Sequence, residues 1–380
     1  QLDRLMSKRQ PGSVFKPFVY AAALNTALSG GANVITPVST LNDEPTTFWF
    51  DGKAYEPADF EKNYRGTVSL RTALAHSLNV PAVELAQQVG YGNVVDLARN
   101  AGMNLDIRPT PAVALGAYDV TPIEVAGGYT IYANHGVFEK PYFLTSIRDD
   151  RGAEIFHEKP EARQVLDPRV AFLMDSLMEE VLRSGTGAGV RARGFTLPAA
   201  GKTGTSRDGW FAGFTSKLLC VVWVGFDDHR ELNLEGAKSA LPVWTAFMKR
   251  AHQHRAYRNV TAFAPPAGIV SVEIDPESGQ LATSGCPNPR PEYFIDGTQP
   301  VEVCHLHGGG TMRIAGWETT APQTPGVTAP AAGAVPVQRA VASPDHSASV
   351  VIPTPPAPSP APADDRKKKS FFGRLKDIFK

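Results

Sequence analysis

The sequence predicts an α+β fold, with an antiparallel sheet flanked by helices and a mainly helical subdomain. The strongest strand signal covers residues 198–226, where Arg207-Asp208-Gly209 and Thr215-Ser216-Lys217 separate three apolar runs, as in a tight meander. Apolar residues at helical spacing dominate residues 67–103 and recur in a long stretch that begins at Asp167-Pro168. The chain has 380 residues, 42% hydrophobic and 20% charged, so it can bury a full core.

The first helix is expected to open at Ser13, directly after the turn signal Pro11-Gly12. Pro17 fixes this start, because a missing backbone N–H is harmless only in the first turn of a helix. Lys16 then lies one turn from Ser13 on the same face. A lysine that burial or a second cation keeps neutral can take the proton of a serine, so the pair suggests a nucleophile with its base. Taken alone, Ser-x-x-Lys is better explained as an N-capping serine and a solvent-reaching lysine.

Residues 29–66 are rich in Gly, Pro, Asn, Asp and aromatic residues, which predicts a long surface excursion with short strands. Such excursions often line a cleft. Val80 precedes a proline and is disfavoured in the α conformation, whereas Pro81 suits the first position of a helix. Ser77-Leu78-Asn79 is therefore expected in a tight bend between two helices.

The remaining elements follow from the same signals of periodicity and turn composition. They are a helix over 119–136, a hairpin around residues 149–152, a helix from Asp167 to Gly185, the meander, a helix over 242–252, and a small β module over 269–304 with a hairpin across 276–279.

The first strand of the meander carries Gly201-Lys202-Thr203-Gly204-Thr205. A phosphate-binding loop would have glycine at position 196, where this sequence has Thr196, and would be followed by a helix instead of a strand. A nucleotide site is therefore rejected. On a strand, the side chains of Lys202, Thr203 and Thr205 can point toward a cleft. Gly204 lets a ligand approach the backbone.

The three motifs Ser-x-x-Lys, Ser-x-Asn and Lys-Thr-Gly, in this order, are far more specific together than singly. In them the sequence resembles the penicillin-recognising serine enzymes, namely penicillin-binding proteins and serine β-lactamases, over roughly residues 1–305. Four longer sequence segments resemble the transpeptidase domain of class A, bifunctional penicillin-binding proteins. These segments are Arg-Gln-Pro-Gly-Ser13-Val-Phe-Lys16-Pro-Phe, Val120-Thr-Pro-Ile-Glu124, Gly201-Lys-Thr-Gly-Thr205 and Asp208-Gly-Trp-Phe-Ala-Gly213.

The resemblance implies a D,D-transpeptidase in which Ser13 attacks the D-Ala-D-Ala carbonyl of a peptidoglycan stem peptide and Lys16 acts as base. Ser77 would relay a proton to the leaving D-alanine, and Lys202 would supply positive potential. The remaining implied roles concern substrate binding: Asn79 for the substrate amide, Thr203 and Thr205 for the carboxylate, the backbone N–H groups of Ser13 and Thr205 for the oxyanion, and Gly204 for close approach.

The resemblance also implies β-lactam inhibitors and cell-wall synthesis proteins as partners, with no cofactor. A serine β-lactamase shares the acylation machinery, and a β-lactam-binding sensor or scaffold without turnover needs only the acylation step. Both remain alternatives to the transpeptidase.

Composition divides the chain into four expected parts: a transpeptidase domain over 1–262, a small β module over 263–312, a Pro/Ala-rich disordered linker over 313–363, and a basic amphipathic tail over 364–380. The tail could rest on an anionic membrane surface. Because the chain begins at Gln1 with the nucleophile motif close behind, we expect a piece of a longer extracytoplasmic protein. Its anchor and any glycosyltransferase domain would lie upstream.

The charge balance and the cysteines bear on two further kinds of site, for nucleic acid and for metal. Lys plus Arg and Asp plus Glu each number 38, so no global field favours nucleic acid. Cys286 and Cys304 could pair in an oxidising compartment, while Cys220 lies in an apolar run. Together with His305 and His307, Cys286 and Cys304 could suggest a zinc site, but no Cys-x-x-Cys pair is present. A disulfide or free thiols are favoured, and no metal site is expected.

Overall fold

The computed structural model describes residues 3–29, 33–57 and 63–307. The expected linker over 313–363 and tail over 364–380 lie outside the described residues. Within the described part of the chain, no helix is both long enough and apolar enough to cross a membrane.

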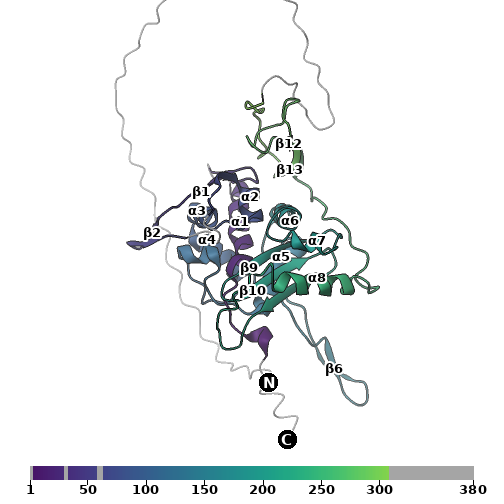
Figure 1. Ribbon diagram of the computed structural model, residues 1–380. Coiled ribbons are helices and arrows are strands. Elements are labelled where there is room, and N and C mark those ends of the chain that lie inside the picture. Colours follow the sequence, from purple (N-terminus) through teal and green to yellow (C-terminus); the bar gives the residue numbers. More distant parts are fainter. Residues whose placement is uncertain (1–2, 30–32, 58–62, 308–380) are drawn as a thin grey trace, which may run out of the picture. The chain divides into compact units, whose positions relative to one another are not determined.

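A three-stranded antiparallel sheet carries the last of the three motifs (Figure 1). Its strands are β9 (Ala200–Thr205), β10 (Gly209–Phe214) and β11 (Leu219–Val224), in the order β11-β10-β9, so the predicted meander is confirmed. Trp210 of β10 lies opposite both Gly204 of β9 and Trp223 of β11. Among the described strands β9 is an edge of this sheet, so part of its backbone is free to pair with other chain segments.

Alternation along β10 explains why both faces of the sheet are covered. Trp210, Ala212 and Phe214 belong to the large apolar cluster shared with α5 (Pro122–Ala133) and α6 (Pro168–Arg183). Phe211 points to the opposite face and packs on Trp244 of α8 (Ala240–Ala251), with ring centroids 4.9 Å apart. The expected helices near 119–136, 167–185 and 242–252 are thus present.

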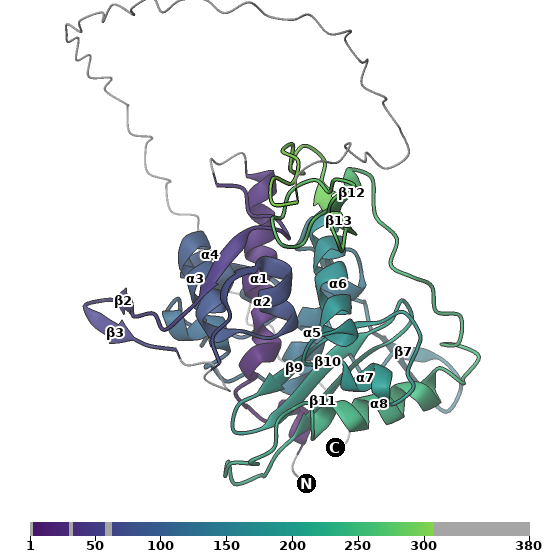
Figure 2. The ribbon, with the colours of Figure 1, turned by 45° about the horizontal axis from the view of Figure 1, so that its top comes forward.

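A helical region surrounds α1 (Lys16–Leu24), which lies among α2 (Leu70–Ala75), α3 (Asn79–Val89), α4 (Tyr91–Asn100) and α6 (Figure 2). Almost every side chain of α1 is buried, which its nearly all-apolar sequence requires. Pro17 lies in its first turn, as predicted, but α1 begins at Lys16, and Ser13 belongs to the 3-10 turn η2 (Gly12–Phe15) directly before it. Together the helices and the antiparallel sheet confirm the α+β class.

Shorter elements connect these layers. The excursion before α2 contains paired short strands, and β6–β7 forms the predicted hairpin. The elements are η1 (Arg4–Met6), η2 (Gly12–Phe15), η3 (Asn25–Leu28), β1 (Thr40–Asp43), β2 (Phe48–Phe50), β3 (Lys53–Tyr55), β4 (Gly66–Ser69), η4 (Pro111–Leu115), β5 (Val137–Glu139), β6 (Ser146–Arg148), β7 (Glu154–His157), β8 (Ala162–Gln164) and α7 (Gly189–Ala192).

The C-terminal β module differs from its expected pairing. Strand β12 (Ile269–Ile274) pairs antiparallel with β13 (Arg290–Ile295), while the hairpin expected across 276–279 is reduced to one bridge between Ile274 and Leu281. Pro287 and Pro289 lie in the segment that follows this bridge, and a proline has no N–H to donate to a ladder. Glu292 of β13 accepts a hydrogen bond of 2.7 Å from Arg71 of α2, and both side chains are buried.

Candidate active site

The three motifs meet at one cleft of about 670 Å³. Ser13, Ser77, Asn79, Thr203 and Thr205 line it, although they come from η2, the α2–α3 bend and β9. Residues 63–65 of the predicted excursion form part of its wall, together with residues 184–186, Glu235 and Ala237. Lys16 and Lys202 are fully buried beside these groups. The structure therefore brings all the sequence-predicted site residues into one neighbourhood.

Two glycines allow the Ser13 segment to pack against the edge of β9. Gly12 has φ +55°, and a Cβ there would lie 2.6 Å from the carbonyl oxygen of Thr205. A Cβ on Gly204 would lie 2.6 Å from the carbonyl oxygen of Pro11. Both separations are too short for a side chain, so backbone meets backbone here. Ser13 is consequently held beside the strand that carries the Lys-Thr-Gly motif.

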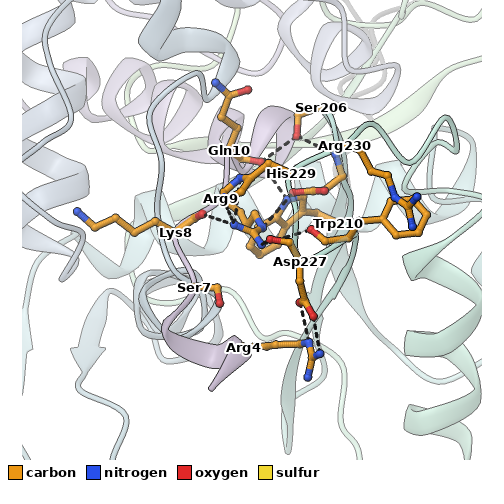
Figure 3. A network of polar contacts seen from close by, with 12 residues as sticks. Arg4, Ser7, Lys8, Arg9, Gln10, Ser206, Trp210, Asp227, His229 and Arg230 are labelled. Atoms are coloured by element: carbon orange, nitrogen blue, oxygen red, sulfur yellow. Dashed lines mark hydrogen bonds and ion pairs between the residues drawn. The ribbon is translucent and has the colours of Figure 1, made fainter. Parts of the chain in front are cut away.

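A polar network holds the residues that precede Ser13, with Arg9 at its centre (Figure 3). The Arg9 guanidinium lies 3.7 Å from the carboxylate of Asp208 and 2.7 Å from Nε2 of His229. The carbonyl oxygen of Gln10 accepts a hydrogen bond of 3.0 Å from Nε1 of Trp210. These contacts connect the segment before Ser13 to the sheet. Arg9 and Asp208 lie within the longer sequence segments quoted above, but the sequence analysis assigned neither of them a role.

The Lys16 amine lies against the α2–α3 bend. Its Nζ donates hydrogen bonds to the carbonyl oxygens of Ser77 (2.6 Å) and Leu78 (2.9 Å) and to Oδ1 of Asn79 (2.7 Å). These contacts hold the Lys16 amine against the bend that carries Ser77 and Asn79.

The Lys202 amine joins the second and third motifs. Its Nζ donates hydrogen bonds to Oγ of Ser77 (2.8 Å) and to the carbonyl oxygen of Thr203 (3.1 Å). Burial, and then the nearby charge of Lys16, hold the pKa of Lys202 well below its usual value. The two buried amines thus compete for protons, which is the electrostatic condition that general-base chemistry needs.

Ser77 occupies a left-handed conformation with φ +59°, which is uncommon for a residue other than glycine. The expected tight bend is therefore present, although Asn79 is already the first residue of α3. The neighbouring turn fits closely, because a Cβ on Gly185 would clash with the carbonyl oxygen of Ala75. This packing holds the Ser77 hydroxyl toward Lys202 and the cleft.

The threonines of β9 border the cleft on its far side. Oγ1 of Thr203 lies 2.6 Å from Oγ1 of Thr186, and Oγ1 of Thr205 accepts a hydrogen bond of 3.0 Å from the backbone N–H of Gly236. The sequence analysis assigned no role to Thr186. Its only signal was a position directly after the helix-ending Gly185.

Comparison with known proteins identifies the family. The family described as "Penicillin binding protein transpeptidase domain" matches residues 2–242, and "Penicillin-binding protein 1A, C-terminal domain" matches residues 265–309. The chain belongs to the penicillin-binding protein transpeptidase family, and its relatives are class A penicillin-binding proteins.

Individual relatives agree with this assignment. Penicillin-binding protein 2D of Bacillus subtilis is 34% identical over 79% of this chain and 43% of its own length. Penicillin-binding protein 1A of Aquifex aeolicus is 35% identical, over 78% and 40% respectively. The chain thus spans less than half the length of these two relatives.

Solved structures agree on the fold. The 2.6 Å crystal structure of penicillin-binding protein 1A from Haemophilus influenzae has a TM-score of 0.71 and 30% identity, covering 80% of this chain and 50% of that one. The PonA1 protein of Mycobacterium tuberculosis in complex with penicillin V has a TM-score of 0.59 at 23% identity, covering 70% of this chain and 74% of that one. The latter supports the fold alone.

Proposed function

We propose that this chain is a D,D-transpeptidase that cross-links peptidoglycan stem peptides through an acyl-enzyme on Ser13. The observation that carries the proposal is the convergence of Ser13, two buried amines and the Ser77 hydroxyl on one cleft. A serine beside buried amines, on a rigid helix start, is the arrangement that nucleophilic acyl transfer requires. Family membership supports the same class of reaction.

Substrate binding prepares the base. The terminal carboxylate of the stem peptide would bind near Lys202, Thr203 and Thr205, and its negative charge favours a proton on Lys202. Because the amines compete, that charge draws the shared proton away from Lys16. Lys16 is then neutral and can accept the proton of Ser13.

Acylation and deacylation then follow with balanced bonds. As the Ser13 hydroxyl loses its proton to Lys16, its oxygen bonds to the penultimate D-alanine carbonyl carbon. The oxyanion is held by the backbone N–H groups of Ser13 and Thr205. The C–N bond breaks, and the terminal D-alanine leaves with a proton relayed by Ser77. An amine of a neighbouring stem peptide attacks the ester, loses a proton to the same groups and restores the serine hydroxyl.

Two further parts of the proposal concern substrate binding and location. The edge position of β9 lets an extended peptide pair with its backbone while Asn79 bonds a substrate amide. Since stem peptides lie outside the cytoplasm, we place the chain in the periplasm or on the outer face of the inner membrane, with cell-wall synthesis proteins as partners. We also retain 1–262 and 263–312 as the limits of the transpeptidase domain and the β module.

The test is mass spectrometry of the intact chain after incubation with penicillin, followed by peptide mapping. We expect one stable adduct located on Ser13, loss of that adduct in Ser13→Ala, and release of D-alanine from a stem peptide when an acceptor amine is present. Normal labelling of Ser13→Ala would refute the nucleophile assignment.

Two other results would replace the transpeptidase with a different function. Rapid loss of the adduct with hydrolysed penicillin in solution would indicate a β-lactamase. A stable adduct without release of D-alanine would indicate a sensor or scaffold.

A further inference from the structure

A second cluster of reactive side chains lies in the C-terminal module, outside the cleft. Asp275, Cys286, Cys304 and His307 each offer a ligand atom, and these four atoms all lie within 4.8 Å of one another. Sγ of Cys304 is 3.2 Å from Oδ2 of Asp275 and 3.5 Å from Nδ1 of His307, and that nitrogen is 3.3 Å from the same carboxylate oxygen. The first three residues are buried, and all three cysteines of the chain are free thiols in the structure.

The three separations among Asp275, Cys304 and His307 have the size of a tetrahedral metal site, and Sγ of Cys286 lies within 4.8 Å of each of these atoms. Zinc bonds of roughly 2.0 Å to nitrogen and 2.3 Å to sulfur place neighbouring ligand atoms about 3.3 to 3.8 Å apart. Two sulfurs and an imidazole favour zinc over magnesium or calcium, which take oxygen ligands. Four protein ligands leave no open position, which is typical of a structural site rather than a catalytic one.

The surroundings of the cluster also fit a bound cation. Nε2 of His307 faces the carboxylate of Glu277 at 3.5 Å, and a metal-binding histidine usually directs its second nitrogen to such a group. The backbone N–H of Thr283 donates to Sγ of Cys286 at 3.2 Å, and the backbone N–H of Ser278 donates to Oδ2 of Asp275 at 3.2 Å. Each donor orients a ligand atom and stabilises its negative charge.

We propose that Asp275, Cys286, Cys304 and His307 bind one Zn²⁺ ion that stabilises the C-terminal module. This departs from the sequence-based expectation of no metal site, which relied on the lack of a Cys-x-x-Cys pair. That reasoning overlooked Asp275 and the Cys304-x-x-His307 spacing. The cysteines lose their thiol protons to solvent as the ion binds.

The module has a physical need for such an ion. Among the described residues, the apolar cluster around the four ligands consists of Ala282, Cys286 and Cys304, so little apolar surface fixes the loops there. The four ligands come from three segments: the end of β12, the loop before β13, and the chain after β13. One ion would therefore connect all three.

The test is the metal content of the full chain, purified in air without reductant or chelator and measured by plasma mass spectrometry. We expect about one zinc per chain, and at least a fivefold loss of zinc in Cys304→Ser and in His307→Ala. The matched controls Cys220→Ser and His305→Ala remove the same residue types outside the cluster and should keep the metal. Co²⁺ in place of Zn²⁺ should give thiolate charge-transfer absorption that Cys304→Ser abolishes.

Chelation supplies an independent readout. Removing the metal should lower the thermal unfolding temperature and expose two thiols to a colorimetric reagent, while re-addition of Zn²⁺ should reverse both changes. A Cys286–Cys304 disulfide in the purified chain, detected by non-reducing peptide mapping, would overturn the proposal. So would zinc content equal in Cys304→Ser and the unsubstituted chain.

Discussion

The active-site cleft and the C-terminal module rely on different forces. The cleft lies among large apolar clusters that contain α1, α5, α6 and the sheet, so even fully buried lysines are tolerated there. In the described part of the module, Ile295 joins the large cluster, while the loops after β12 enclose a separate cluster of three small residues. The buried pair of Arg71 and Glu292 connects the module to α2. Substitutions in the cleft should therefore change acylation, whereas substitutions in the module should change unfolding.

The largest expected effect comes from removing a buried amine in the cleft. Lys202→Met should lower the second-order rate constant of penicillin acylation by roughly 10²- to 10⁴-fold, because proton transfer and charge stabilisation are lost together. The thermal unfolding temperature should be unchanged or higher, since a desolvated amine is removed. Stopped-flow acylation and calorimetry measure the two quantities.

The pH profile sharpens this prediction. Because burial and the Lys16 charge lower the pKa of Lys202, the amine pair gives up a proton well below the usual pKa of a lysine, so the acylation rate should rise with pH in that lower range. Lys202→Met should move this rise, and the matched control Lys217→Met, on the exposed turn between β10 and β11, should not. An unchanged profile in Lys202→Met would contradict the role of the pair.

How far the sequence predicts this structure depends on the range of each interaction. The meander, the helix start at Pro17 and the bend at Ser77 follow from local turn and proline chemistry, and the motifs identify the residues of the cleft. The pairing of β12 with β13 and the contact of Thr186 with Thr203 depend on long-range packing, which leaves no local pattern. The contacts of the Lys16 amine also required coordinates, because its acceptors come from the bend between α2 and α3, about sixty residues further along the chain.

In the module, the buried ion pair gives the next largest effect. Glu292→Gln leaves the Arg71 guanidinium buried without a carboxylate, which should lower the free energy of unfolding by about 3–5 kcal/mol. The rate of penicillin labelling at low temperature should stay within about twofold of that of the unsubstituted chain, because Glu292 lies outside the cleft. The exposed Glu302→Gln is the control in the same module, and urea unfolding followed by fluorescence is the measurement. Equal unfolding of the two variants would show that the pair contributes no stability.

A smaller effect is expected where the cleft depends on close backbone contact. Gly12→Ala adds a Cβ 2.6 Å from the carbonyl oxygen of Thr205 and should reduce acylation by about tenfold, as Ser13 is displaced. Gly52→Ala is the matched control, because Gly52 also has positive φ but no atom lies within 4 Å of its added Cβ. Both variants carry backbone strain, so only the clash distinguishes them. Equal acylation rates would mean that this contact does not position the nucleophile.

The smallest effect tests whether the large core tolerates every buried charge. Burial, and then Glu179, hold the pKa of Asp175 in α6 well above its usual value, so the folded state keeps a proton that the unfolded state has lost. Stability should therefore fall as pH rises above about 4 toward that raised pKa. Asp175→Asn removes this dependence and should be more stable at neutral pH by about 1 kcal/mol, with no difference at acid pH. Calorimetry across pH, with the exposed Asp150→Asn as control, measures it. If Asp175→Asn is less stable than the unsubstituted chain at neutral pH, the carboxylate stabilises the core, and the prediction is wrong.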